Sequence, residues 1–182
     1  MWEPTDRGRR QFLRVGAAAL ITTIASPALA ALPRHQVRTV SFENLHTGER
    51  LKVDYWVNGR YLPDAMGAVD QVLRDHRTNE VHAIDPELLD LLDALSHRLG
   101  TRVPYQVVSG YRSPATNAML RAQSDGVAAQ SLHMEGMAID IRVPGRTLRS
   151  VHRVALQLER GGVGYYPRSD FVHVDVGRVR RW

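Results

Sequence analysis

The sequence predicts an α+β fold, in which a small mixed or antiparallel sheet is flanked by helices. Two observations favour this class. Strand-like segments near both ends of the domain are joined by short turns, as in β-hairpins, and the segments between them mix helices and strands without a regular order. A parallel doubly wound sheet would require strands and helices to alternate regularly.

Residues 1–30 are predicted to be an export signal. Arg9 and Arg10 precede a weakly apolar run over residues 15–24, which is far shorter than the roughly 20 residues that span a bilayer. Ala28 and Ala30 then form a small-residue cleavage pattern. The paired arginines indicate the twin-arginine route, which a receptor reads and which is not an anchor. We therefore expect the twin-arginine translocation machinery as a partner, and no stable membrane insertion after the signal is cleaved.

Residues 31–182 have the usual size of one domain with a sizeable core. The net charge of +5 falls to about +3 without the signal, which suits an anionic polymer such as the cell wall as well as many other partners. No run of basic residues interleaved with aromatic ones occurs, so nucleic acid is not an expected partner. The sequence has no cysteine, so stability must come from the core and any bound metal.

The first elements of the domain are predicted to be a hairpin and two helices that serve as scaffold. Strands over residues 36–43 and 49–57 flank a turn, because apolar residues alternate with polar ones in the second of them. Apolar residues at helical spacing predict helices over 64–76 and 86–99. Asp85 is the expected cap of the second helix, and Gly100 its end.

The second half of the domain is predicted to alternate strands and helices. In the last strand, His173 and Asp175 share one face while Val172 and Val174 share the other, which gives the strand a buried back and a functional front. The expected strands are 105–109, 136–143, 163–166 and 171–176, and the expected helices are 114–122 and 147–161.

His133, Asp140 and His173 are the candidate metal ligands. Two imidazoles and one carboxylate are the ligand set of a catalytic zinc ion, whose fourth position is open to water, and the lack of cysteine excludes a thiolate site. Gly136 indicates a loop that enters a strand, with His133 on the loop and Asp140 in the strand. Each residue also has a structural alternative, since a lone histidine beside apolar residues is usually a hydrogen-bonded core residue and Asp140 could end a strand.

Four motifs occur in order around these residues: Ser109-Gly110-Tyr111-Arg112-Ser113, His133-x-x-Gly136-x-Ala138-x-Asp140, Gly162-Val163-Gly164-Tyr165-Tyr166 and Phe171-Val172-His173-Val174-Asp175. Together they resemble the zinc metallopeptidase group that contains D-Ala-D-Ala peptidases, lysostaphin and hedgehog domains, and within it the murein endopeptidase K family. The resemblance covers essentially the whole chain. It implies that His133, Asp140 and His173 hold one Zn²⁺ per chain, and that the chemistry is amide hydrolysis.

The resemblance also implies three further site residues, and a fourth is a candidate. Asp170 lies where the wider group places an acidic general base, although it is one methylene shorter than the glutamate of some members. Asp175 could be the base or could orient a ligand, so the choice between the two carboxylates stays open, with Asp175 favoured as indispensable. Arg112 is expected to bind the carbonyl oxygen or a carboxylate of the substrate. Ser131, on which the resemblance does not decide, could position His133 or substrate, or could equally be a simple loop serine.

The leading hypothesis is a zinc-dependent periplasmic murein endopeptidase. It would hydrolyse peptide cross-links of peptidoglycan, at bonds that involve meso-diaminopimelate, during cell-wall growth. One alternative is a D-Ala-D-Ala-type carboxypeptidase. The other is a non-catalytic wall-binding domain that keeps zinc for structure.

Overall fold

The computed structural model describes residues 36–124 and 126–182 of the 182-residue chain, and these belong to one compact unit. The export signal expected over residues 1–30 lies outside the described residues and stays a prediction. Within the described part, none of the helices has the length and apolar character needed to cross a bilayer.

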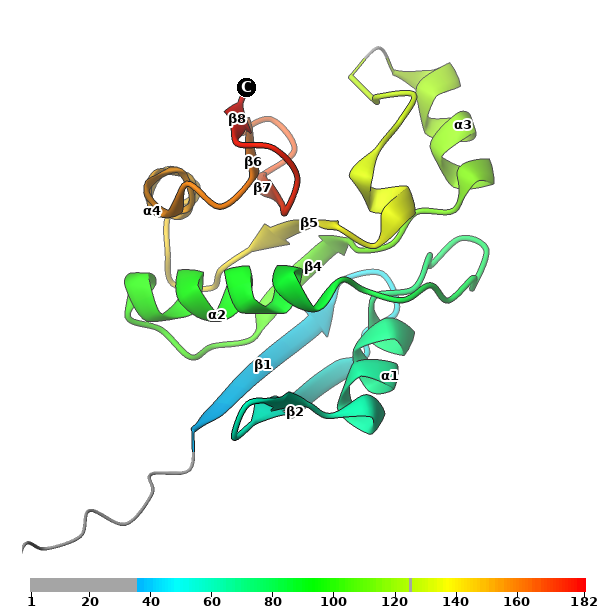
Figure 1. The fold of residues 1–182 in the computed structure, drawn as a ribbon. Coiled ribbons are helices and arrows are strands. Elements are labelled where there is room, and N and C mark those ends of the chain that lie inside the picture. The colour runs from blue at the N-terminus through cyan, green and yellow to red at the C-terminus, as the bar shows by residue number, and fades with distance from the viewer. Residues whose placement is uncertain (1–35, 125) are drawn as a thin grey trace, which may run out of the picture. The chain divides into compact units, whose positions relative to one another are not determined.

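One eight-stranded mixed sheet forms the centre of the fold (Figure 1). Its strand order is β3-β2-β1-β4-β5-β7-β6-β8. The pairs β1–β4 and β6–β8 are parallel and the other neighbours are antiparallel, which confirms the predicted α+β class. The strands are β1 (Val37–Asn44), β2 (Arg50–Val57), β3 (Arg60–Tyr61), β4 (Tyr105–Ser109), β5 (Ala138–Arg142), β6 (Gly162–Tyr166), β7 (Phe171–Asp175) and β8 (Arg180–Arg181).

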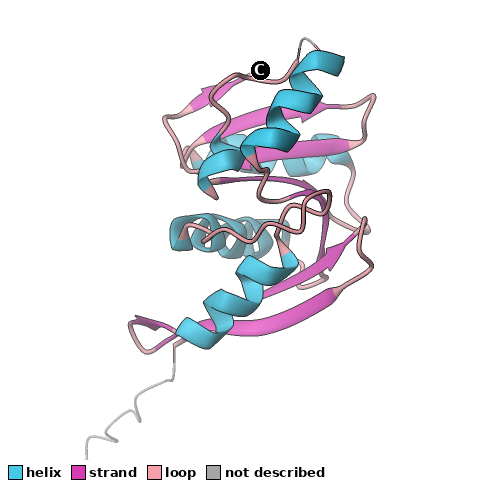
Figure 2. Cartoon of the chain, turned by 90° about the vertical axis from the view of Figure 1, so that its right-hand side faces the viewer, coloured by secondary structure: helices cyan, strands magenta, loops and turns pink. Residues whose placement is uncertain are grey.

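Three of the four described α-helices begin after a capping side chain. Asp85, Ser113 and Thr147 each accept a hydrogen bond from a backbone N–H of the following first turn, and left-handed Gly100 ends the second helix. Figure 2 views the domain from the side that carries α1 and α3. The helices are α1 (Pro63–Val72), α2 (Pro86–Leu99), α3 (Pro114–Gln123) and α4 (Leu148–Leu158), with a 3₁₀ turn, η1 (Leu132–Glu135).

The predicted elements differ from the structure mainly at their ends. Helix α1 stops at Val72 rather than at His76, because Asp75 forms a turn whose carboxylate accepts hydrogen bonds from the N–H groups of Arg77 and Ser113. Helix α4 stops at Leu158, since Glu159 is left-handed. Strands β3 and β8 were not predicted, because two residues are too few to show a period.

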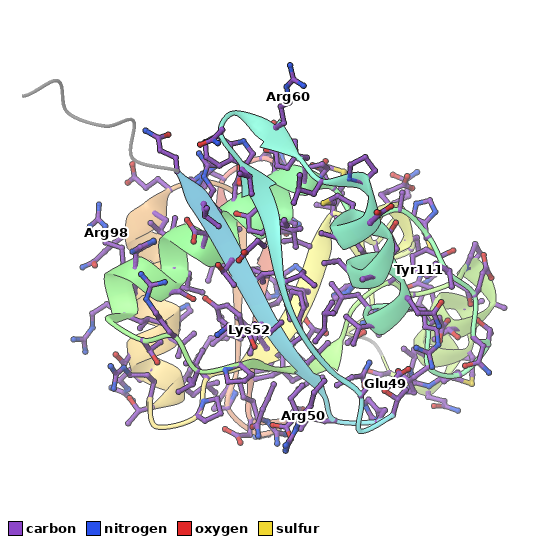
Figure 3. The ribbon with its side chains drawn as sticks, turned by 90° about the horizontal axis from the view of Figure 1, so that it is seen from below. Glu49, Arg50, Lys52, Arg60, Arg98 and Tyr111 are labelled. Carbon is purple, nitrogen blue, oxygen red and sulfur yellow. The ribbon has the colours of Figure 1, made fainter. Side chains whose placement is uncertain are left out.

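The two faces of the sheet have different roles. Cross-strand neighbours on one face are apolar, for example Val107 with Ile141 and Ile141 with Val172, and they pack with α1, α2 and α4 in the core. Charged residues lie on the other face, where Glu43 pairs directly with Arg50 across the hairpin at 2.6 Å. At the edge of the domain, Arg60 and Arg98 project outward (Figure 3). The sheet therefore has a polar face away from the core.

Candidate metal centre

The three predicted ligands meet on the polar face of the sheet. Asp140 in β5 and His173 in β7 are directly paired residues of neighbouring antiparallel strands, so their side chains leave the sheet side by side. The same row continues to Ser109 in β4 and to Gly164 in β6. His133 comes from η1, which precedes β5 and ends at left-handed Gly136.

The ligand atoms lie at the spacing that zinc requires. His133 Nε2 is 3.2 Å from His173 Nδ1, and Asp140 Oδ1 is 2.9 Å from that nitrogen and 3.3 Å from His133 Nε2. Tetrahedral zinc with bonds of about 2.0–2.1 Å has ligand atoms about 3.3 Å apart. All three side chains are buried, and in the described part of the chain they are the one group of at least three potential metal ligands.

The hydrogen bonds on the outer side of the imidazoles fix where their protons lie. His133 Nδ1 is 2.7 Å from the Gly110 carbonyl oxygen, and His173 Nε2 is 3.0 Å from Asp175 Oδ2. A carbonyl and a carboxylate can only accept, so both nitrogens carry hydrogen. The inner nitrogens of the neutral rings are then lone-pair donors that face Asp140 Oδ1. Three converging lone pairs require a cation, and these residues therefore fit zinc.

The pKa values reflect the same demand for positive charge. Burial lowers the pKa of His173, but its hydrogen bonds to Asp140 and Asp175 outweigh burial and raise it to about 9. Burial raises the pKa of Asp140, and the two histidines outweigh this and hold it well below its usual range. The pKa of His133 is lowered by its burial. Without metal, a proton on His173 thus takes the place of the cation.

Asp175 lies behind His173, on the side away from Asp140. It is fully buried, and its two oxygens accept from His173 Nε2, from the Arg180 guanidinium and from the N–H groups of Gly162 and Gly177. Burial raises its pKa, but these donors outweigh burial and lower it. Asp175 therefore contacts a ligand and not the open side of the cluster.

Asp170 is not brought to the cluster. It lies in the turn between β6 and β7 with φ of 53°, its side chain is 67% exposed, and it pairs with Arg142 at 3.3 Å. Its neighbours Ser169 and Phe171 line the cavity at the cluster, whereas Asp170 does not. The two carboxylates between which the sequence did not decide thus have different surroundings.

A cavity of about 830 Å³ opens from the three ligands. Arg112 and Ser131 line it, as do the basic residues Arg77 and Arg180, and Asp140 is the one carboxylate among the described residues of its wall. The Arg112 guanidinium is 12% exposed and lies 3.6 Å from Asp140 Oδ2. Its Nε is buried without a hydrogen-bond partner among the described residues. Arg112 therefore presents its guanidinium beside Asp140 at the wall of the cavity.

The family model described as peptidoglycan L,D-endopeptidase MepK matches residues 33–182. The chain belongs to the MepK family. This membership confirms the resemblance inferred from the four motifs.

Two relatives show how far the similarity to this peptidase family extends. The peptidoglycan L,D-endopeptidase MepK of Escherichia coli (strain K12) is 43% identical over 178 residues, which cover 97% of this chain and 98% of the relative. The probable peptidoglycan L,D-endopeptidase MepK of Haemophilus influenzae is 42% identical over 179 residues, or 97% and 96% of the two chains.

Two aromatic residues of this MepK-family site were not among the predicted site residues. Tyr166 and Trp182 line the cavity, and the Trp182 ring lies 5.2 Å from that of His173. From the sequence, Tyr166 could line a groove, with packing as the default expectation; it lies two residues after Gly164 in a strand and so shares its face. No comparable signal existed for Trp182, whose position depends on β8.

Proposed function

We propose that the protein is a zinc-dependent peptidoglycan endopeptidase that hydrolyses peptide cross-links, at bonds involving meso-diaminopimelate, during cell-wall growth. The observation that carries the proposal is the buried triangle of lone pairs from His133, Asp140 and His173 beside an open cavity. The name of the relatives, peptidoglycan L,D-endopeptidase, supports the substrate class.

The three ligands would hold one zinc ion per chain. When bound, zinc supplies a Lewis acid for the scissile carbonyl and lowers the pKa of a water molecule towards about 7. By accepting the outer protons, the Gly110 carbonyl and Asp175 orient the rings so that the inner nitrogens of His133 and His173 face the metal position. Arg112 and Ser131 face the cavity, where we assign them to substrate binding.

Asp175 is assigned a positioning role rather than that of general base. Both of its oxygens are already engaged by donors, and it lies behind His173. Asp170 is assigned to the surface, because it pairs with Arg142 away from the cluster.

The charge of the cavity suits an anionic peptide. Arg77, Arg112 and Arg180 line its wall, and a planar guanidinium pairs bidentately with a carboxylate. A cross-link that contains meso-diaminopimelate offers such a carboxylate beside the scissile bond. A terminal carboxylate would satisfy Arg112 equally well, which keeps the D-Ala-D-Ala-type carboxypeptidase as the second candidate.

Peptidoglycan lies outside the cytoplasmic membrane, so we place the protein in the periplasm. The arginine pair and the cleavage pattern of residues 1–30 support export by the twin-arginine route.

The test is to incubate the zinc-loaded protein with purified cross-linked muropeptides and to identify the products by mass. An endopeptidase converts dimers into monomers, and His133→Ala should abolish the conversion. Release of one terminal amino acid would instead indicate a carboxypeptidase. Binding without any product at full zinc occupancy would contradict the proposal.

A further inference from the structure

Tyr166 lies on the face of the sheet that carries the metal ligands. Gly164 in β6 is paired with His173 in β7, and Tyr166 follows two residues later, so the three share one face. Its paired residue Phe171 stacks against it at 4.5 Å between ring centres. The neighbouring Tyr165 points to the opposite face, where its ring lies 4.8 Å from that of His152 in α4.

Gly164 leaves room for the indole of Trp182. A Cβ atom at Gly164 would come within 2.8 Å of two ring atoms of Trp182 and one of Tyr166. The backbone of Trp182 is held in place as well, because its N–H donates to the Val163 carbonyl at 3.3 Å and its carbonyl accepts from Tyr165 N–H at 3.1 Å. The indole is therefore fixed against the sheet between His173 and Tyr166.

A hydrogen bond from this indole determines that the Tyr166 hydroxyl oxygen is an acceptor and leaves its proton available. Trp182 Nε1–H lies 2.7 Å from the Tyr166 hydroxyl oxygen, and an indole nitrogen can only donate. The hydroxyl oxygen therefore accepts, and its own proton takes no part in this bond. Throughout the described residues this is the one hydrogen bond of the hydroxyl, which lines the cavity together with Arg112 and the three ligands.

The geometry points to Tyr166 as a catalytic residue, and to Trp182 as the residue that positions it, if the protein is the endopeptidase proposed above. The Tyr166 hydroxyl donates its hydrogen bond to the carbonyl oxygen of the scissile peptide group while negative charge builds on that oxygen. No covalent bond to Tyr166 forms or breaks. A donor that is already oriented needs no reorganisation during the reaction, which is why such a group stabilises the transition state more than the bound substrate.

The experiment compares three single variants and one double variant on cross-linked muropeptides, each loaded with zinc. Tyr166→Phe should lower kcat about 100-fold, the size reported for the loss of one such donor, with KM and zinc content little changed. Trp182→Phe keeps an aromatic ring but removes the donor, and it should lower kcat less. In the double variant, Trp182→Phe should cost almost nothing beyond Tyr166→Phe, because Trp182 acts through Tyr166.

Tyr165→Phe is the matched control, since it removes the hydroxyl of the adjacent tyrosine on the other face and should leave kcat unchanged. The indole N–H resonance of Trp182 gives a second measurement, independent of turnover, and should shift in Tyr166→Phe. If the wild type cleaves the muropeptides and Tyr166→Phe is equally active, the proposed role of Tyr166 is wrong and the proposed function still holds. A wild type that cleaves nothing overturns both.

Discussion

Among the described residues, every hydrogen-bond partner of Asp175 is a donor. His173, Arg180 and two backbone N–H groups point at its oxygens. An asparagine at this position would have to turn its NH₂ group towards a donor. The carboxylate therefore matters both for the orientation of His173 and for the stability of the turn after β7.

Replacing this carboxylate should weaken zinc binding. Asp175→Asn is expected to lower zinc affinity about 10- to 100-fold, because the loss of a group that orients a metal ligand typically has an effect of this size. It should also lower the free energy of unfolding by about 1–3 kcal/mol, through the donors that it leaves unpaired. Competition with a chelator measures the affinity, and urea unfolding measures the stability.

Asp170→Asn is the control for this prediction, because the Asp170 carboxylate is mostly exposed. It should change neither zinc affinity nor cleavage. If Asp170→Asn abolished cleavage while Asp175→Asn did not, the two assignments would be reversed.

At this scale the sequence predicted that His133, Asp140 and His173 gather, but not how the two carboxylates differ. Asp170 and Asp175 lie three residues before and two residues after His173 in the sequence, and the family resemblance made both of them candidates. The positive φ of Asp170 turns it away from the cluster, and the donors around Asp175 come from Gly162, Gly177 and Arg180, which lie in separate loops and strands. Neither fact leaves a pattern in the sequence.

Among the elements, η1 carries the one ligand that does not come from a strand. Gly136 ends it in the left-handed region, and a Cβ atom at Gly136 would overlap the Ala83 carbonyl. The Gly136 carbonyl also accepts from Asp85 N–H, the residue that caps α2. The position of His133 is thus tied to the start of α2.

Gly136→Ala should therefore disturb the metal centre. The left-handed backbone costs about 1–2 kcal/mol for alanine and the overlap adds to it, so the free energy of unfolding should fall by about 2–5 kcal/mol. His133 would move with η1, and zinc affinity should fall as well. Calorimetry and zinc titration measure the two effects.

Gly145 offers the matched comparison, because it has a similar φ of 75° but nothing within 4 Å of an added Cβ. Gly145→Ala should lower the free energy of unfolding by only about 1–2 kcal/mol, the cost of a left-handed backbone for alanine, and should leave zinc binding intact. Equal effects of both substitutions would show that the approach of Gly136 to Ala83 is unimportant.

The elements themselves were largely predictable, and their neighbours in the sheet were not. Alternating residues in β2 and β7, and the caps Asp85 and Thr147, identified strands and helices close to their true bounds. The insertion of β7 between β5 and β6 has no local signal, yet it alone places His173 between Asp140 and Gly164.

On the scale of the whole domain, the site couples metal, protons and stability. The pKa of His173 in the metal-free fold is raised from 6.5 to about 9, so the protonated ring stabilises that fold fully below pH 6.5. This contribution is lost as the pH rises through about 9. Zinc replaces the proton, and the zinc-loaded protein should not lose stability over the same range.

Zinc binding should accordingly displace about one proton from His173 near neutral pH and progressively less from this residue above pH 9, and ionisation of a zinc-bound water would add to the total. Calorimetric zinc titrations in two buffers with different ionisation enthalpies measure this number. The thermal midpoints of the loaded and chelated proteins should also move apart as the pH rises from 6.5 to 9. Zinc binding at neutral pH with no proton released would contradict the assignment of a proton to His173 in the metal-free site.

The location of Trp182 has a practical consequence for anyone who handles this protein. Its indole forms part of the cavity wall, and its backbone is hydrogen-bonded to β6 on both sides. An affinity tag added after Trp182 would start beside the metal ligands, and a histidine tag would bring competing imidazoles to them. Tags are better attached ahead of β1, whose residues do not line the cavity.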